Sequence, residues 1–167
     1  GIAHTFAQCG YVVNLVDVNE AALQKAIATI TKNLERQLQK GSITEDIKNS
    51  TLKNITTYSD LSKAATHADL VIEAASENLD VKLKIFRQLD EICPSQTIFA
   101  SNTSSISITQ IAAATKRADR VIGMHFMNPV PVMKLVEVIR GYTTSDVVCD
   151  LIMSTSNTRR TLLTDCI

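Results

Sequence analysis

Two hydrophobic periodicities alternate along the chain. Short runs of apolar residues are typical of buried strands, and longer stretches with an apolar residue every three or four positions are typical of amphipathic helices. The runs predict strands at 11–16, 55–57, 70–75, 97–100, 121–124, 135–139 and 161–164. The longer stretches predict helices at 2–9, 20–40, 45–53, 79–92 and 145–154, with shorter helices starting near 60 and at 107.

Glycine and capping residues support these boundaries. Gly10 and Gly41 are placed to end helices, and Asn19 and Thr44 can cap the helices that follow them. Near-continuous apolar strands that alternate with helices favour a mostly parallel sheet with helices on both faces. The sequence therefore predicts an α/β protein with a doubly wound fold, organised as one domain over residues 1–167.

Composition narrows the classes of partner. The 167 residues have a formal net charge of +0, and 45% of them are hydrophobic. This balance gives no reason to expect a nucleic acid or a membrane surface as partner, and no apolar run is long enough for a transmembrane helix. The cysteines show no metal-binding or disulfide spacing: Cys9, Cys93, Cys149 and Cys166. We therefore expect free thiols, no metal and a cytoplasmic location.

Polar residues follow four of the predicted strands. They are Asp17 and the segments 73–78, 101–105 and 125–128. Doubly wound folds bind ligands at the carboxyl ends of their parallel strands. The four segments are therefore expected to converge on one crevice.

His125 and Glu137 are the strongest candidates for chemistry. His125 ends one apolar run, and Glu137 is the only carboxylate inside the next. A histidine can act as a general base while a carboxylate orients its ring and stabilises its charged form. Burying Glu137 without a partner would be costly, which favours the pairing. A purely structural His–Glu pair is the alternative.

Three residues at other strand ends could contact a cofactor. A carboxylate at Asp17 suits the hydroxyls of an adenosine ribose and disfavours a 2′-phosphate, although it could instead cap the following helix. Lys82, together with Glu77, lies at the entry to a predicted helix and could meet a phosphate or a ribose. The alternative for both is an ordinary solvated first helical turn.

Ser104 lies in a hydroxyl-rich strand-to-helix junction. It lacks the G-x-S-x-G turn of a hydrolase nucleophile, so a hydrogen bond to a substrate oxygen fits better. The alternative is a capping function for the helix that begins at Ser107. His4 and His67 are expected in unremarkable helical positions.

Two motifs resemble those of the 3-hydroxyacyl-CoA dehydrogenase family. They are SNTSS at 101–105 and HFMNPVPVMKLVEV at 125–138, and the segments 1–3 and 71–78 also match. The resemblance covers essentially the whole chain and is nearest to the 3-hydroxybutyryl-CoA type. It implies a Rossmann-type NAD-binding domain.

The resemblance also implies a reaction and roles for its residues. NAD would oxidise an L-3-hydroxyacyl-CoA to the 3-ketoacyl-CoA, in fatty acid or butanoate metabolism. His125 would be the general base, Glu137 its orienting partner, Ser104 a ligand of the substrate oxygen or nicotinamide region, and Asn128 a neighbour of the nicotinamide. The other implied contacts are Asp17, Glu77 and Lys82 for NAD, and Asn33 and Lys40 for coenzyme A.

Departures from the family pattern qualify this reading. Against the family pattern, we expect the 167 residues to lack the first strand and the glycine-rich turn that binds the pyrophosphate, and to lack the helical C-terminal domain. That domain would form a homodimer, and we expect the 167-residue chain alone to be inactive. Two alternatives stay open: a related NAD-dependent hydroxy-acid dehydrogenase, and a non-catalytic or structural remnant of the same scaffold.

Overall fold

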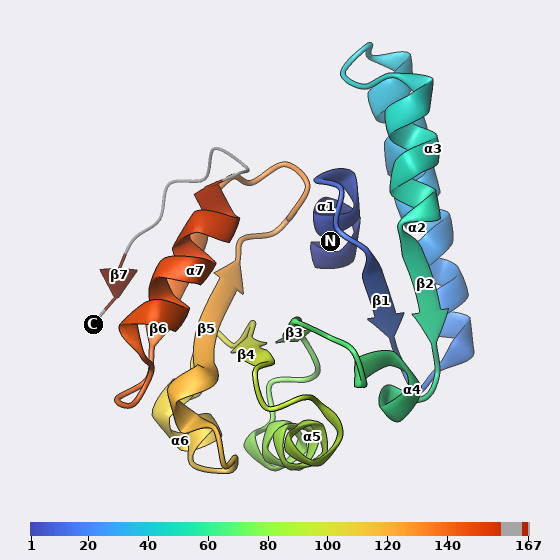
Figure 1. The fold of residues 1–167 in the computed structure, drawn as a ribbon. Coiled ribbons are helices and arrows are strands. Elements are labelled where there is room, and N and C mark those ends of the chain that lie inside the picture. The colour runs from blue at the N-terminus through green and yellow to red at the C-terminus, as the bar shows by residue number, and fades with distance from the viewer. Residues whose placement is uncertain (158–164, 167) are drawn as a thin grey trace. The chain divides into compact units, whose positions relative to one another are not determined.

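The computed structural model describes residues 1–157 and 165–166, which divide into two compact units (Figure 1). The first unit comprises Gly1–Ala64 and Asn128–Val132, and the second comprises Ala65–Met127 and Met133–Ile167. Each unit has its own sheet, so the residues of each are considered in turn.

The first unit is built on a two-stranded parallel sheet. Strands β1 (Val13–Val16) and β2 (Ile55–Tyr58) pair side by side, and three helices accompany them: α1 (Ile2–Gln8), α2 (Glu20–Gln39) and α3 (Glu45–Lys53). Asn19 caps α2 as predicted, because its side chain accepts hydrogen bonds from the backbone amides at 21 and 22. Gly41 follows α2 at φ +66°, a left-handed conformation that glycine adopts without strain. A short helix, α4 (Leu61–Ala65), ends this part of the chain.

The second unit contains five strands in the order β3-β4-β5-β6-β7. These are β3 (Leu70–Glu73), β4 (Ile98–Ser101), β5 (Val121–Phe126), β6 (Val136–Arg140) and β7 (Asp165–Cys166). The helical elements are α5 (Leu79–Ile92), α6 (Ile108–Ala112), the 3₁₀ turn η1 (Ala118–Arg120) and α7 (Asp146–Asn157). Strands β3, β4 and β5 are parallel, so their carboxyl ends share one edge of the sheet.

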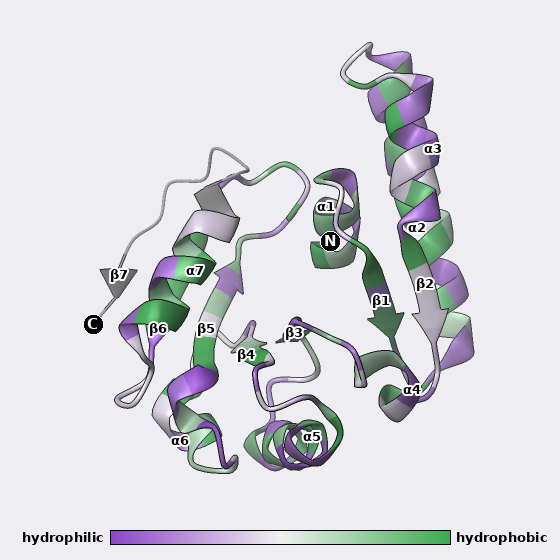
Figure 2. Cartoon of the chain, viewed as in Figure 1, coloured by the Kyte–Doolittle hydropathy of each residue, from purple (hydrophilic) through white to green (hydrophobic). Residues whose placement is uncertain are grey.

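The core of the second unit lies around β4 and β5. All four residues of β4 are buried, and the rings of Phe99 and Phe86 meet edge to face at 5.9 Å. Helix α5, seen nearly end-on in Figure 2, carries both hydrophilic and hydrophobic residues, and it buries Phe86 and Leu89. The amphipathic pattern of 79–92 therefore predicted this helix correctly, although Val81 of its apolar positions is exposed and Lys82 is buried.

The mostly parallel α/β fold is confirmed, with differences in detail that include the end of β3 and the direction of β6. The predicted strand 70–75 ends at Glu73, whose side chain accepts a hydrogen bond from the amide of Ala75 and so turns the chain. Strand β6 runs antiparallel to β5, because the segment between them is too short for a parallel crossover. The strand predicted at 161–164 lies outside the described residues. None of the described helices is long and apolar enough to cross a membrane.

Candidate active site

His125 and Glu137 face each other across the antiparallel strands β5 and β6. They are direct register partners, and Nδ1 of His125 lies 2.8 Å from Oε2 of Glu137. Their side chains are 23% and 31% exposed. Glu137 is therefore only partly buried, which corrects the expectation of a buried carboxylate, since the edge of the pair stays open to solvent. The structure brings the two predicted residues together as expected.

This contact leaves one ring nitrogen of His125 available for chemistry. When Glu137 accepts a hydrogen bond from Nδ1–H, Nε2 carries the lone pair and can take a proton from a bound molecule. The resulting imidazolium would lie against a carboxylate, which stabilises it. The pair therefore has the geometry of a general base and its orienting partner.

The SNTSS segment uses most of its polar side chains for internal contacts. The hydroxyl of Ser101 donates to Glu73 Oε2 at 2.6 Å, and those of Thr103 and Ser105 donate to Glu77 Oε1. Ser104 is exposed, and within residues 1–157 its hydroxyl has no hydrogen-bond partner. Of the four hydroxyls in the segment, the one on Ser104 is thus available to bind a ligand.

The alternative for this junction, a helix cap, applies to Ser107 and not to Ser104. Ser107 caps α6 instead, because its hydroxyl accepts a hydrogen bond from the amide of Gln110 at 3.4 Å. A hydrogen bond to β5 also holds the SNTSS segment in place, because the side-chain oxygen of Asn102 accepts from the amide of Phe126 at 2.8 Å. Asn102 therefore ties the segment to β5, one residue beyond His125.

Glu77 collects the donors of this segment on one oxygen. Its Oε1 accepts hydrogen bonds from the hydroxyls of Thr103 and Ser105 and from the amides of Ser104 and Ser105. The bond from Thr103 above all, with those from Ser105 and Ser104, lowers the pKa of Glu77 to about 2 against a smaller opposing effect of burial. Glu77 is therefore an anion at every physiological pH.

Lys82 is buried, which contradicts its expected alternative as a solvated residue of a first helical turn. Its side chain is 1% exposed, and its ammonium lies 2.8 and 3.0 Å from the two carboxylate oxygens of Glu73. A second contact of 3.5 Å reaches Glu77 Oε2. Sequence analysis missed Glu73 as the partner, although a glutamate that ends a buried strand nine residues before a lysine in the next helix was a usable signal. A contact between Lys82 and NAD stays a prediction.

The other predicted site residues belong to the first unit. Asp17 follows β1, is exposed, and accepts a hydrogen bond from the amide of Asn19 at 2.8 Å, so the helix cap itself is Asn19. Lys40 is the exposed residue after α2, and Asn128 is exposed in the segment between β5 and β6. Their contribution to a site shared with His125 stays a prediction, as does the convergence of all four strand ends.

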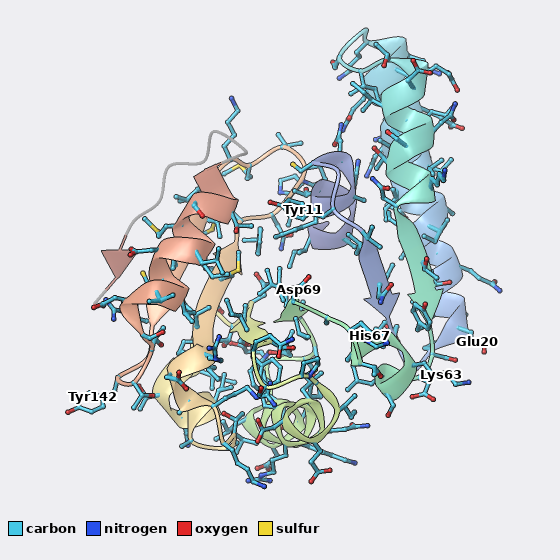
Figure 3. The ribbon with its side chains drawn as sticks, in the orientation of Figure 1. Tyr11, Glu20, Lys63, His67, Asp69 and Tyr142 are labelled. Atoms are coloured by element: carbon cyan, nitrogen blue, oxygen red, sulfur yellow. The ribbon has the colours of Figure 1, made fainter. Side chains whose placement is uncertain are left out.

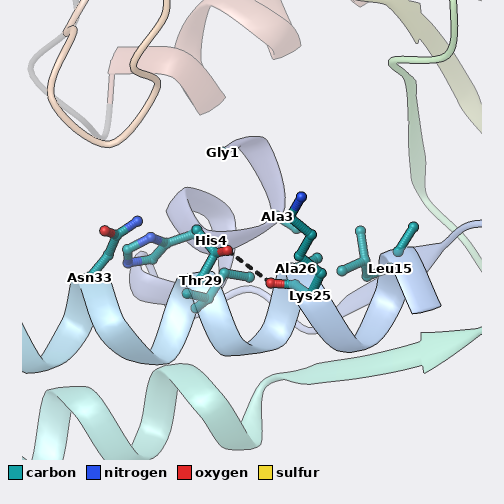
Figure 4. Close-up of a pocket in the computed structure, with 10 residues that line it drawn as sticks. Gly1, Ala3, His4, Leu15, Lys25, Ala26, Thr29 and Asn33 are labelled. Atoms are coloured by element: carbon teal, nitrogen blue, oxygen red, sulfur yellow. Dashed lines mark hydrogen bonds between the residues drawn. The ribbon is translucent and has the colours of Figure 1, made fainter. Parts of the chain in front are cut away.

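Asn33 lines a cavity of about 350 Å³ in the first unit (Figure 4). Lys25, Thr29 and Asn33 reach it from α2, and His4, which is 0% exposed, reaches it from α1. Sequence analysis missed His4 and Lys25 here. The spacing of four residues between Lys25, Thr29 and Asn33 predicts a polar stripe on one helical face, and it could have found this wall of the cavity.

Comparison with known proteins identifies the family to which this chain belongs. Residues 1–160 match the model of the 3-hydroxyacyl-CoA dehydrogenase, NAD binding domain. The chain belongs to the 3-hydroxyacyl-CoA dehydrogenase family. NAD is the cofactor of the matched domain.

Relatives of known structure and sequence agree with this assignment to the 3-hydroxyacyl-CoA dehydrogenases. A probable 3-hydroxybutyryl-CoA dehydrogenase of Bacillus subtilis is 53% identical over 87% of the chain and 50% of its own length. The human mitochondrial hydroxyacyl-coenzyme A dehydrogenase is 47% identical over 87% of the chain and 48% of its own length. A crystal structure of 3-hydroxybutyryl-CoA dehydrogenase from Escherichia coli superposes with a TM-score of 0.96 at 44% identity, over 99% of this chain and 35% of that one.

A second crystal structure, (S)-3-hydroxybutyryl-CoA dehydrogenase from Ralstonia eutropha, gives a TM-score of 0.94 at 46% identity, over 98% of this chain and 58% of that one. The chain thus spans about half the length of the curated relatives it matches.

No group of histidines, cysteines and carboxylates that could hold a metal ion occurs among the described residues.

Proposed function

We propose that this chain carries the NAD-binding and proton-transfer groups of an L-3-hydroxyacyl-CoA dehydrogenase. The single observation that carries the proposal is the 2.8 Å contact between His125 Nδ1 and Glu137 Oε2 at the carboxyl end of β5. The names of the relatives point to a short-chain substrate such as 3-hydroxybutyryl-CoA.

In the proposed reaction, Nε2 of His125 takes the proton of the substrate's 3-hydroxyl group. Glu137 holds the ring and stabilises the imidazolium that forms. The hydroxyl of Ser104 donates a hydrogen bond to the substrate oxygen, which gains negative character as its proton leaves. NAD⁺, when bound, would supply the acceptor for the hydride that leaves the carbon bearing this oxygen. In the reverse direction His125 returns the proton to the 3-keto oxygen.

The residues named in the sequence analysis are proposed as the contacts of NAD and of the coenzyme A part of the substrate. Asp17 accepts hydrogen bonds from the adenosine ribose and repels a 2′-phosphate, which favours NAD over NADP. Glu77, Lys82 and Asn128 contribute to the NAD site, and Asn33 and Lys40 contact the coenzyme A part of the substrate. The active enzyme is a homodimer, and the free thiols of the described cysteines favour a cytoplasmic location.

The test is the turnover of acetoacetyl-CoA with NADH by the complete gene product. His125→Ala should lower kcat by about 10²- to 10⁴-fold, because the general base and acid is lost. Glu137→Gln should also lower kcat, since the imidazolium loses its counter-charge. His67→Ala is the matched control: this histidine is exposed and is labelled in Figure 3.

The outcomes separate the three candidate functions. Turnover that survives His125→Ala would overturn the assigned base. Turnover of other hydroxy acids but not of acyl-CoA would favour the related dehydrogenase, and binding of NADH without any turnover would favour the non-catalytic scaffold. A separate assay of the 167-residue chain checks the expectation that it is inactive alone.

A further inference from the structure

The carboxylate of Glu73 is the centre of a buried polar network in the second unit. It accepts hydrogen bonds from the amide of Ala75 at 2.6 Å, the hydroxyl of Ser101 at 2.6 Å and the ammonium of Lys82 at 2.8 and 3.0 Å. The side chain of Glu73 is 2% exposed. These donors come from three different segments: the turn after β3, helix α5 and the last residue of β4.

The network continues from Lys82 to the SNTSS segment. Lys82 lies between the two carboxylates, 2.8 Å from Glu73 and 3.5 Å from Glu77. Glu77 points its other oxygen at the hydroxyls and amides of 103–105. A shift of Lys82 would therefore move Glu77, and a shift of Glu77 would release the backbone on both sides of the Ser104 side chain.

Glu73 holds the same segment at its start as well. Its carboxylate binds the hydroxyl of Ser101, and its backbone carbonyl accepts a hydrogen bond from the amide of Asn102 at 2.8 Å. One buried residue thus fixes the segment directly at 101–102 and indirectly at 103–105. Burial deprives the carboxylate of Glu73 of its favourable hydration. Its hydrogen-bond and ion-pair partners offset this loss only when all of them are in place.

We propose that Glu73 is a positioning residue for the dehydrogenase reaction: through Ser101, Lys82 and Glu77 it sets where the hydroxyl of Ser104 meets the substrate oxygen. The inference rests on the function proposed above. Glu73 touches neither substrate nor cofactor in this account. Its effect on the rate is exerted through the segment it anchors.

Amide hydrogen exchange of the 167-residue chain tests the physical link. In Glu73→Gln the amides of Ser104 and Ser105 should exchange about tenfold faster relative to the core amide of Phe99, because Lys82 and Glu77 lose their fixed positions. The double variant Glu73→Gln with Lys82→Met removes both buried charges together, which limits the loss of overall stability. It should show the same local increase.

Asp90→Asn is the matched control for the exchange experiment. It breaks a second ion pair of α5, in which Asp90 Oδ1 lies 2.7 Å from Arg117 Nε, at the end of the helix remote from Glu77. It should destabilise the unit without a selective effect on Ser104 and Ser105. Equal relative exchange in wild type, Glu73→Gln and the double variant would overturn the proposal.

Kinetics of the complete gene product test the consequence for the reaction. Glu73→Gln should lower kcat about tenfold, and Ser104→Ala should add less than about twofold in that background although it costs about tenfold in the wild type. Additive losses would overturn a role exerted through Ser104. A wild-type protein that turns over no acyl-CoA would instead overturn the proposed function, and the exchange result would still decide whether Glu73 holds the segment.

Discussion

At the scale of single residues, the structure distinguishes side chains that hold the backbone in place from side chains that remain free to bind a ligand. In the SNTSS segment three hydroxyls are used within the protein, and Ser104 is exposed. The sequence predicted that this segment faces a ligand, but four neighbouring hydroxyls look alike in a sequence. Only the positions of Glu73 and Glu77 decide which of them is left for a substrate.

The lowered pKa of Glu77 leads to a prediction about folding stability at acidic pH. Because its pKa is lowered to about 2 by its hydrogen bonds with 103–105, its contribution to folding stability is fully present above the ordinary carboxyl pKa, near 4.5. That contribution is lost as the pH falls from about 4.5 through about 2. An NMR titration of the Glu77 side chain should give a midpoint near the lower value, with the amide of Ser104 shifting in parallel. A midpoint near 4.5 would mean that these bonds are absent in solution.

At the scale of elements, helix α5 is fixed at both ends by charged side chains. Its start carries the Lys82 network, and its end is held by Arg117, which pairs with Asp90 and donates to the carbonyls of Asp90, Cys93 and Pro94. The guanidinium also lies 4.8 Å from the centre of the Phe99 ring. The hydrophobic periodicity of 79–92 predicted the helix with correct bounds, but gave no sign of Arg117, which lies far along the chain.

Arg117→Ala should lower the free energy of unfolding by about 3 kcal/mol, because it leaves Asp90 and the carbonyls that end α5 without their shared donor. Urea denaturation followed by circular dichroism gives the value. Arg120→Ala is the control, since within residues 1–157 the side chain of Arg120 donates one hydrogen bond, to the carbonyl of Gln96 at 3.2 Å. Equal midpoints for the two variants would show that Arg117 has no special role.

At the scale of the whole molecule, the apolar positions are divided between two units with separate sheets. Periodicity in the sequence predicted β1 to β6 and a mostly parallel sheet, but it does not say which strands pair. Cys93 and Cys149 are buried in the second unit, and Cys9 is exposed in the first. Desolvation by burial is the main cause that raises the pKa of the Cys93 thiol, which disfavours the reactive thiolate.

Thiol labelling should follow this division. In the native chain Cys9 should react with a maleimide at least about tenfold faster than Cys93 and Cys149, which should react only when the protein unfolds. Mass spectrometry of proteolytic peptides identifies the labelled sites. Rapid native labelling of Cys93 would contradict the packed end of α5, whereas labelling of all three sites in urea confirms that each thiol is reduced.

The sequence by itself determined the helices, the buried strands and the motifs that mark the family, because these depend on local periodicity and on short runs of residues. It also suggested the pairing of His125 with Glu137, since a carboxylate inside an apolar run is costly to bury without a partner. Only the tertiary structure decided that Lys82 is buried, that Glu73 and Glu77 share it, and that Ser104 is left available. These contacts join segments that are distant in the chain, and their energies depend on distance and burial, which no local pattern of residue types encodes.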